Sequence, residues 1–145
     1  MNSNEILGLL QRHGVKPTAN RIIIAGALAQ ASNPLSLSDL EVDIATIDKS
    51  SIFRTLATFK EHGLVHVIED GSDSAKYELC HGTGDEHDSD RHVHFYCERC
   101  NRTFCLSQVH VPQVQLPAGY QVRGVNYLVK GLCPRCAAQA AMQQD

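Results

Sequence analysis

The sequence contains no hydrophobic run that approaches the roughly 20 residues needed to cross a membrane. Its first ten residues carry Glu5 and no Lys or Arg, so they lack the basic start of a secretory signal peptide. Internal repeats and low-complexity tracts are also missing. These absences predict a cytoplasmic protein without a membrane partner, and its 43% hydrophobic content is enough for a packed core.

An excess of basic residues, the usual mark of a nucleic-acid-binding protein, is missing too. The chain has 13 Lys and Arg against 16 Asp and Glu, a formal net charge of −3. Residues 1–65 hold six of each sign, whereas residues 66–145 hold seven basic and ten acidic residues. Any DNA-binding surface must therefore come from the placement of a few cations in the first half.

Four of the six cysteines form two Cys-x-x-Cys pairs that are separated by 32 residues, namely Cys97, Cys100, Cys133 and Cys136. Each pair can present two thiolates to one ion, and two pairs complete the tetrahedral site that structural zinc prefers. A reducing cytosol favours metal over disulfide. A redox pair or a disulfide-bridged pair is the alternative. A zinc enzyme is disfavoured because four thiolates leave no open position for water, and no His-x-Glu motif of a deaminase is present.

The first half has helical periodicity, and the second half has short strand-like runs. Helices are expected at residues 4–13, 18–31 and 49–62, with another capped by Ser36 or Ser38 that carries Leu40, Val42 and Ile44. Strands are expected at 64–68 and 76–79, around a turn at 70–73. This order is typical of a winged helix-turn-helix domain, whose helix enters the major groove and whose hairpin wing touches the DNA backbone.

The sequence after residue 80 predicts a polar linker followed by a smaller α/β domain. Residues 81–91 are polar and without periodicity, strands are expected at 93–96, 103–106 and within 120–132, and a helix at 137–144. The expected organisation is a winged-helix domain at 1–80, a linker at 81–91 and a dimerisation and metal-binding domain at 92–145, in an α+β fold.

Six short motifs follow one another along the chain. They are GVKPTANR at 14–21, IFRTL at 52–56, GLV at 63–65, YEL at 77–79, HVHFYCERC at 92–100 and GLCPRC at 131–136. With these motifs in this order, the chain resembles the ferric uptake regulator (Fur) superfamily of bacterial metal-dependent repressors over nearly its whole length. It is most similar to the zinc uptake regulator (Zur) branch, which has a His near His66 and a Cys near Cys80.

The resemblance implies a homodimer that represses metal-uptake genes by binding double-stranded DNA at an AT-rich palindrome, with no enzymatic activity. Arg54 resembles a phosphate-contacting Arg, and Lys16 resembles a Lys that enters the narrow minor groove of AT-rich DNA. Phe53 stands where the family usually has Tyr, and keeps a ring for contact with a thymine methyl. The predicted DNA contacts are Lys16, Arg21, Lys49, Ser50, Ser51, Phe53, Arg54 and Thr55. The alternative is that this helix face binds a protein.

A second, regulatory metal site is expected from the remaining Cys and His residues. His92 and His94 alternate, so on a strand they would share one face. Cys105 stands where the family usually places a carboxylate ligand. The predicted donors are His66, Cys80, His92, His94 and Cys105. Thiolate and imidazole favour zinc, whereas iron or manganese would favour carboxylate and imidazole.

Alternatives remain for these donors. Cys80 and Cys105 could be buried apolar residues or redox-sensing thiols that respond to peroxide, and His66 could be structural. The family's hinge histidine is replaced at or near Pro34, and Arg91 and Val93 replace two ligands of a further family site. Acidic and His residues within 81–90 could bind extra metal, but a solvated loop is the simpler interpretation; they are His81, Asp85, Glu86, His87, Asp88 and Asp90.

Overall fold

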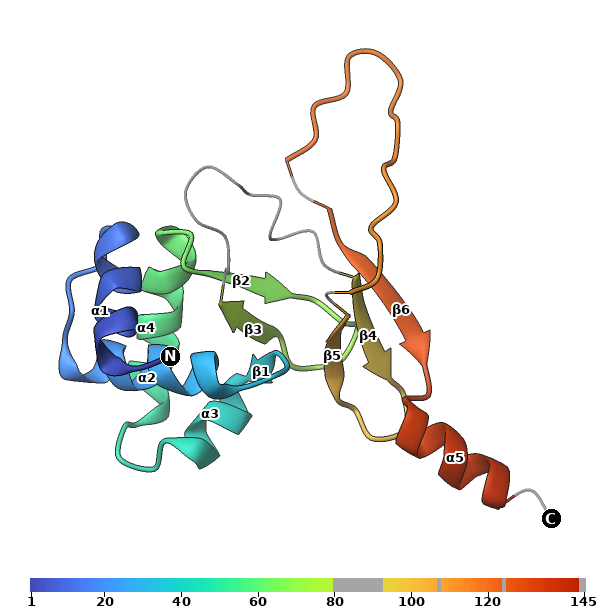
Figure 1. Cartoon of the computed structure of the whole chain (residues 1–145), viewed down its shortest axis with the longest axis horizontal. Helices are drawn as coiled ribbons and strands as arrows, with labels where there is room; N and C mark the ends of the chain where they lie inside the picture. The colour runs from blue at the N-terminus through green and yellow to red at the C-terminus, as the bar shows by residue number, and fades with distance from the viewer. Residues whose placement is uncertain (80–92, 107, 124, 144–145) are drawn as a thin grey trace. The chain divides into compact units, whose positions relative to one another are not determined.

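The computed structural model describes residues 1–79, 93–106, 108–123 and 125–143, and the chain divides into two units, Met1–His81 and Gly82–Asp145 (Figure 1). Cys80 and His92, together with the loop between them, lie outside the described residues. Within the described ranges, every helix is too short or too polar to cross a lipid bilayer.

The first unit contains the expected helices followed by a hairpin. Its elements are α1 (Ser3–Arg12), α2 (Ala19–Gln30), β1 (Leu35–Ser36), α3 (Leu37–Asp43), α4 (Lys49–Glu61), β2 (Val65–Ile68) and β3 (Lys76–Leu79). The three strands form an antiparallel sheet in the order β1-β3-β2, and the helices gather at one end of the β2–β3 hairpin (Figure 1). Strand β1 was not expected, because two residues are too short to show a period.

Each helix of this unit begins at a polar side chain that accepts a hydrogen bond from a backbone N–H of the first turn. Asn2, Thr18, Ser36 and Asp48 occupy these N-cap positions. Of the two serines expected to cap the third helix, Ser36 does so, in a capping box with Asp39. The caps satisfy N–H groups that have no partner within the helix, and so fix where each helix starts.

The core of the first unit is formed by apolar residues from all four helices and the hairpin. Ile52, Leu56 and Phe59 lie one helical turn apart on α4 and are completely buried. This confirms the predicted face of that helix. The third helix carries Leu40 and Val42 as predicted, whereas Ile44 is its C-cap residue and lies just past its last residue, Asp43.

The second unit is a three-stranded sheet followed by one helix. Its elements are β4 (Val93–Cys97), β5 (Thr103–Leu106), β6 (Tyr127–Gly131) and α5 (Pro134–Met142), with strand order β5-β4-β6. Strand β5 is antiparallel to β4, and β6 is parallel to it. The strand expected within 120–132 is thus restricted to β6. The final helix begins at Pro134 rather than near residue 137, since Cys133 is its N-cap and Pro is favoured at the first helical position.

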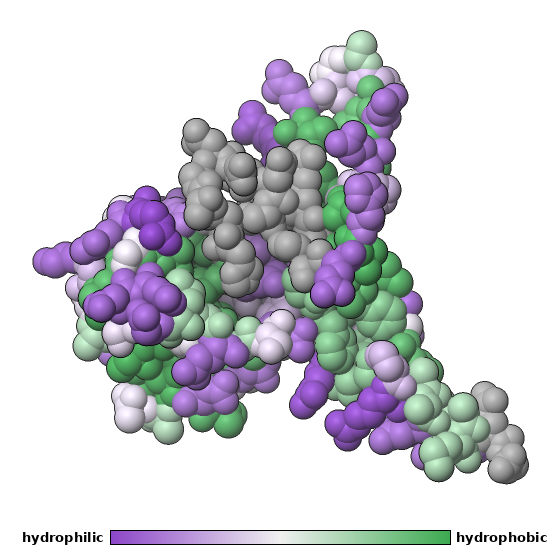
Figure 2. Space-filling view, in the orientation of Figure 1, coloured by the Kyte–Doolittle hydropathy of each residue, from purple (hydrophilic) through white to green (hydrophobic). Residues whose placement is uncertain are grey.

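Few hydrophobic side chains are buried in the described part of this second unit. Its cluster consists of Cys97, Cys133 and Cys136, against which Phe95 and Phe104 pack. Figure 2 shows hydrophobic residues at the surface over β6; Val129 on this strand is 49% exposed, and Leu132, directly after it, is 42% exposed. So small a core needs additional stabilisation, such as a metal ion or association with another chain.

Candidate functional site

The four cysteines of the two Cys-x-x-Cys pairs converge at one end of the second sheet. Cys97 ends β4, Cys100 follows in the turn, and Cys133 and Cys136 begin α5. All four sulfur atoms lie within 4.8 Å of one another, and the Cys100 and Cys133 sulfurs are 4.0 Å apart. Four thiolates at about 2.3 Å from a zinc ion would be about 3.8 Å apart. The donor set and its spacing therefore fit structural zinc.

Backbone amides surround the sulfur of Cys97. The N–H groups of Cys100 and Cys133 point at this sulfur from 3.5 and 3.4 Å. Burial raises the pKa of the Cys97 thiol, but these amides outweigh it and bring the pKa down to about 6. Burial, followed by hydrogen bonds with the other cysteines, raises the pKa of Cys136 to about 12. At neutral pH Cys136 therefore stays a thiol unless a cation binds, and a metal ion at the centre of the cluster would stabilise all four cysteines as thiolates.

The predicted regulatory donor His66 contacts Glu78, a residue outside the predicted donor set. His66 on β2 lies opposite Glu78 on β3, and His66 Nε2 is 2.9 Å from Glu78 Oε2. The hairpin register would have revealed this pair, because placing Val65 opposite Leu79 also places His66 opposite Glu78. Imidazole and carboxylate together can hold a divalent cation, or the carboxylate can orient the imidazole of a metal ligand.

Two other predicted donors face each other in the second unit. His94 on β4 and Cys105 on β5 are direct cross-strand partners, and the His94 side chain is buried. Directly opposite residues have their Cβ atoms about 5 Å apart, close enough to bind one ion. Cys80 and His92 lie outside the described residues, as does the acidic loop at 81–90. The structure therefore pairs His94 with Cys105 and leaves the rest of the donor set a prediction.

Helix α4 presents most of the predicted DNA contacts on its solvent side. Lys49, Ser50 and Arg54 are exposed, and Phe53 is 54% exposed although it is a large aromatic residue. Opposite this face lie the residues buried in the core. An exposed aromatic ring can make an apolar contact with a base, and the cation beside it can contact a phosphate.

Two smaller residues of α4 have intrahelical partners. Ser51 Oγ donates to Asp48 Oδ1 over 2.6 Å, and Thr55 Oγ1 donates to the Ser51 carbonyl over 2.9 Å. Arg54 Nη2 in turn donates to Ser51 Oγ at 3.3 Å. Ser51 and Thr55 thus support the helix start and the Arg54 side chain.

The turn before α2 holds the other predicted DNA contacts together. Arg21 Nη1 donates to the carbonyl oxygen of Lys16 over 2.9 Å, and the Lys16 side chain is exposed. Thr18 between them accepts from the Arg21 N–H. Arg21 therefore fixes the backbone that carries Lys16, and Lys16 is available to a nucleic acid.

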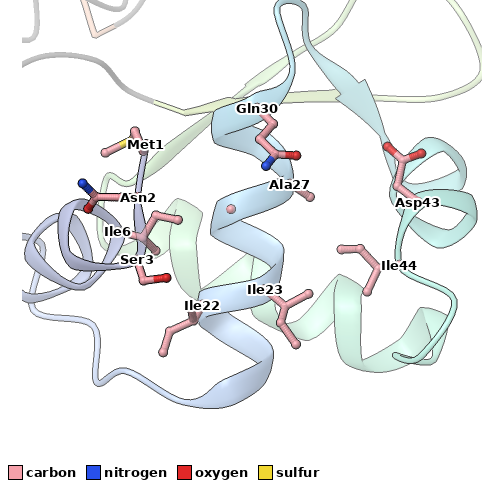
Figure 3. A pocket seen from close by; sticks show the side chains of 11 residues that line it. Met1, Asn2, Ser3, Ile6, Ile22, Ile23, Ala27, Gln30, Asp43 and Ile44 are labelled. Carbon is pink, nitrogen blue, oxygen red and sulfur yellow. The ribbon is translucent and has the colours of Figure 1, made fainter.

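An open pocket of about 480 Å³ lies at the start of α1, against α2 and the end of α3 (Figure 3). It is lined by apolar side chains (Ile6, Ile22, Ile23 and Ile44) and by polar ones (Asn2, Ser3, Gln30 and Asp43). It contains none of the predicted site residues.

Residues 12–127 match the sequence model of the ferric uptake regulator family. The chain belongs to the ferric uptake regulator (Fur) family. Members of this family are metal-responsive transcription regulators, not enzymes, and they act as dimeric DNA-binding proteins. The match confirms the resemblance to the superfamily, while the zinc uptake branch stays a prediction.

Solved structures show the same fold. The Fur protein of Helicobacter pylori, described as having three functional metal binding sites, is similar with a TM-score of 0.64 and 15% identity, over 94% of this chain and 95% of that chain. The Vibrio cholerae Fur protein has a TM-score of 0.63 and 18% identity, over 88% and 98% of the two chains. A zinc-bound manganese uptake regulator has a TM-score of 0.59 and 16% identity, over 88% and 98%.

Proposed function

We propose that this Fur-family protein is a zinc-responsive homodimeric repressor of metal-uptake genes in the cytoplasm. In this proposal residues 1–80 form the DNA-binding domain, residues 81–91 a linker and residues 92–145 the dimerisation and metal-binding domain. Zinc at a regulatory site raises affinity for an AT-rich palindromic operator in double-stranded DNA. Regulation by metal requires the ion to bind the DNA-competent state more tightly than the other state.

The observation that carries the choice of zinc is the cross-strand pair of His94 and Cys105. Thiolate and imidazole ligands suit zinc, whereas iron(II) and manganese(II) prefer carboxylates and imidazoles. The proposed donors are His66, Cys80, His92, His94 and Cys105, with Glu78 as a ligand or as the group that orients His66. The four-cysteine cluster holds a separate, structural zinc.

The pair of His66 and Glu78 supports the second candidate, a regulator that responds to iron or manganese. A carboxylate 2.9 Å from an imidazole provides the harder donors that those metals prefer. The two candidates differ in whether Cys105 or Glu78 controls the response, so variants of these residues distinguish them.

In DNA binding, α4 is proposed as the helix that enters the major groove. Arg54 contacts phosphate, Phe53 contacts a thymine methyl, and Lys16 reaches into the minor groove. The exposure of all three side chains supports these roles. Lys49 and Ser50 complete the exposed face of the helix.

The test is fluorescence anisotropy of a labelled AT-rich palindromic duplex, titrated with protein whose structural zinc is intact. Free zinc, iron(II) and manganese(II) are buffered separately under anaerobic, reducing conditions. A zinc regulator binds the duplex more tightly at a far lower free concentration of zinc than of the other ions. In that case Cys80→Ser and Cys105→Ser abolish the response, and the control His110→Ala, which removes an exposed histidine outside the donor set, retains it.

Other outcomes select other functions. The second candidate is identified if iron(II) or manganese(II), rather than zinc, raises the affinity for the duplex. This response should then be lost in Glu78→Gln and kept in Cys105→Ser. A redox sensor is identified if the affinity for DNA is the same with every metal but changes on addition of peroxide, and if this change depends on Cys80 or Cys105. The DNA surface is tested with Arg54→Ala, which should reduce the salt dependence of binding by about one ion per chain. Lys130→Ala, an exposed cation of the second unit, serves as the matched control.

A further inference from the structure

Two histidines 49 residues apart exchange hydrogen bonds across the first unit. His13 Nδ1 lies 3.2 Å from the carbonyl oxygen of His62, and His62 Nδ1 lies 3.1 Å from the carbonyl oxygen of His13. A carbonyl oxygen can only accept, so each ring nitrogen carries the hydrogen and donates it. The pair is thus a reciprocal clamp with two bonds of the same kind.

The clamp joins the ends of two helices that terminate in the same way. His13 is the C-cap of α1 and His62 is the C-cap of α4. Each is followed by a glycine with a positive φ, +71° at Gly14 and +73° at Gly63, which only glycine adopts without strain. Each histidine satisfies a carbonyl at the other helix end, where most helices use only local groups or water.

The clamp connects the two segments proposed to contact DNA. Lys16 follows His13 by three residues, after the buried Val15, and its own carbonyl accepts from Arg21. His62 ends α4, the helix that carries Arg54. The backbone that holds Lys16 is therefore fixed on one side by Arg21 and on the other by the end of the helix proposed to read DNA.

We propose that His13 and His62 are positioning residues for DNA binding, which hold Lys16 at a fixed distance from α4. This inference rests on the proposed function. Neither histidine needs to touch DNA. A cation in the minor groove and a helix in the major groove must match the duplex at the same time, so a loose connection between them lowers affinity.

The experiment compares His13→Asn and His62→Asn with His13→Gln and His62→Gln in the zinc-loaded full-length protein. Asn keeps an N–H donor near the position of Nδ1, whereas the amide of Gln lies farther out and cannot replace it. Dissociation constants for the AT-rich duplex are measured by anisotropy over a range of salt concentrations, and folding is followed by circular dichroism. His110→Ala is the control for loss of an exposed histidine.

The Gln variants are expected to bind DNA about two- to tenfold more weakly, the range of one lost hydrogen bond. Their salt dependence should fall by about one ion per chain as Lys16 loses its contact, and the Asn variants should retain both properties. In a Lys16→Ala background, His13→Gln should cause no further loss of affinity, because the residue it positions is already gone.

Two results would overturn the inference. In the first, the Gln variants melt at a lower temperature but keep the wild-type affinity and salt dependence, which would make the clamp a stabilising feature only. In the second, His13→Gln weakens binding equally with and without Lys16. If the wild-type protein binds no AT-rich duplex with any metal, the proposed function itself fails, and the inference fails with it.

Discussion

Lys76 Nζ, on the first residue of β3, lies 2.8 Å from Oδ2 of Asp70 in the turn between β2 and β3, and both side chains are buried. Asp70 also accepts from the Ser72 N–H over 2.9 Å. Lys76 is the only Lys or Arg between residues 61 and 79. Because its charge is neutralised by Asp70, the hairpin presents no cation to a DNA phosphate, and the proposed DNA contacts lie on α4 and at Lys16.

The first prediction concerns this ion pair. Replacing Lys76 by Met should lower the free energy of unfolding by about 3 kcal/mol, because it leaves the Asp70 carboxylate buried without its counter-ion. Urea denaturation followed by circular dichroism measures the effect. Lys60→Met, at an exposed position of α4, is the control and should change stability by less than about 0.5 kcal/mol. If Lys76→Met lowered the free energy of unfolding no more than Lys60→Met does, the ion pair of Lys76 and Asp70 would contribute little to stability.

Much of the first unit could be predicted because its local signals agree with its packing. The spacing of Ile52, Leu56 and Phe59 gave the buried face of α4, and cap residues marked the helix starts. Strand β1 was missed because its two residues are ordered by pairing with Tyr77 and Lys76, which are far along the chain. Such non-local pairing leaves no periodic pattern in the sequence.

The candidate metal centres were predictable to the extent that their ligands have a fixed spacing. The two Cys-x-x-Cys pairs specify their own geometry, and the cluster of Cys97 with its three partners confirms it. Glu78 was missed because its role depends on which residue of β2 it faces. Strand register follows from the whole hairpin, and a shift of one residue would have placed Glu78 on the other face.

The second prediction tests the cap of α3. Ser36→Ala should cost about 1 kcal/mol of stability, because the N–H of Asp39 loses its acceptor and the capping box is broken. Thermal and urea unfolding give the measurement. Ser38→Ala is the matched control, since Ser38 is exposed and lies within the helix, and it should be nearly neutral. A cost at Ser38 equal to that at Ser36 would contradict the assignment of the cap.

The third prediction separates the two types of cysteine. Cys100→Ser should remove the structural zinc and unfold much of the second unit, whose buried cluster is built around the cysteines. Metal analysis of the purified protein and circular dichroism report both changes. Cys105 lies outside the four-cysteine cluster, so the Cys105→Ser variant should retain one tightly bound zinc per chain. If Cys105→Ser also lost that zinc, Cys105 would have to be a ligand of the structural site.

The fourth prediction follows from the start of α4, where hydrogen bonds from the Ser51 hydroxyl and the Ser51 N–H hold the pKa of Asp48 below its ordinary value of 3.8. The ionised carboxylate therefore stabilises the folded protein at pH values above 3.8, and this contribution disappears as the pH falls through the lower pKa of the folded state. Asp48→Asn keeps a side-chain acceptor at the N-cap but cannot titrate. The wild-type protein should thus melt at a higher temperature than Asp48→Asn at about pH 6, and the gap should narrow towards about pH 3.

The gap between the two melting temperatures is the proper quantity to follow, because zinc release at low pH affects both proteins in the same way. Asp48→Ala, which has neither the charge nor the acceptor, should melt below Asp48→Asn throughout the range and so separates capping from titration. A gap between wild type and Asp48→Asn that is the same at both pH values would contradict the prediction. The hydrogen bonds of Ser51 would then fail to distinguish the ionised carboxylate from a neutral acceptor, and the start of α4 would depend on hydrogen-bond geometry alone.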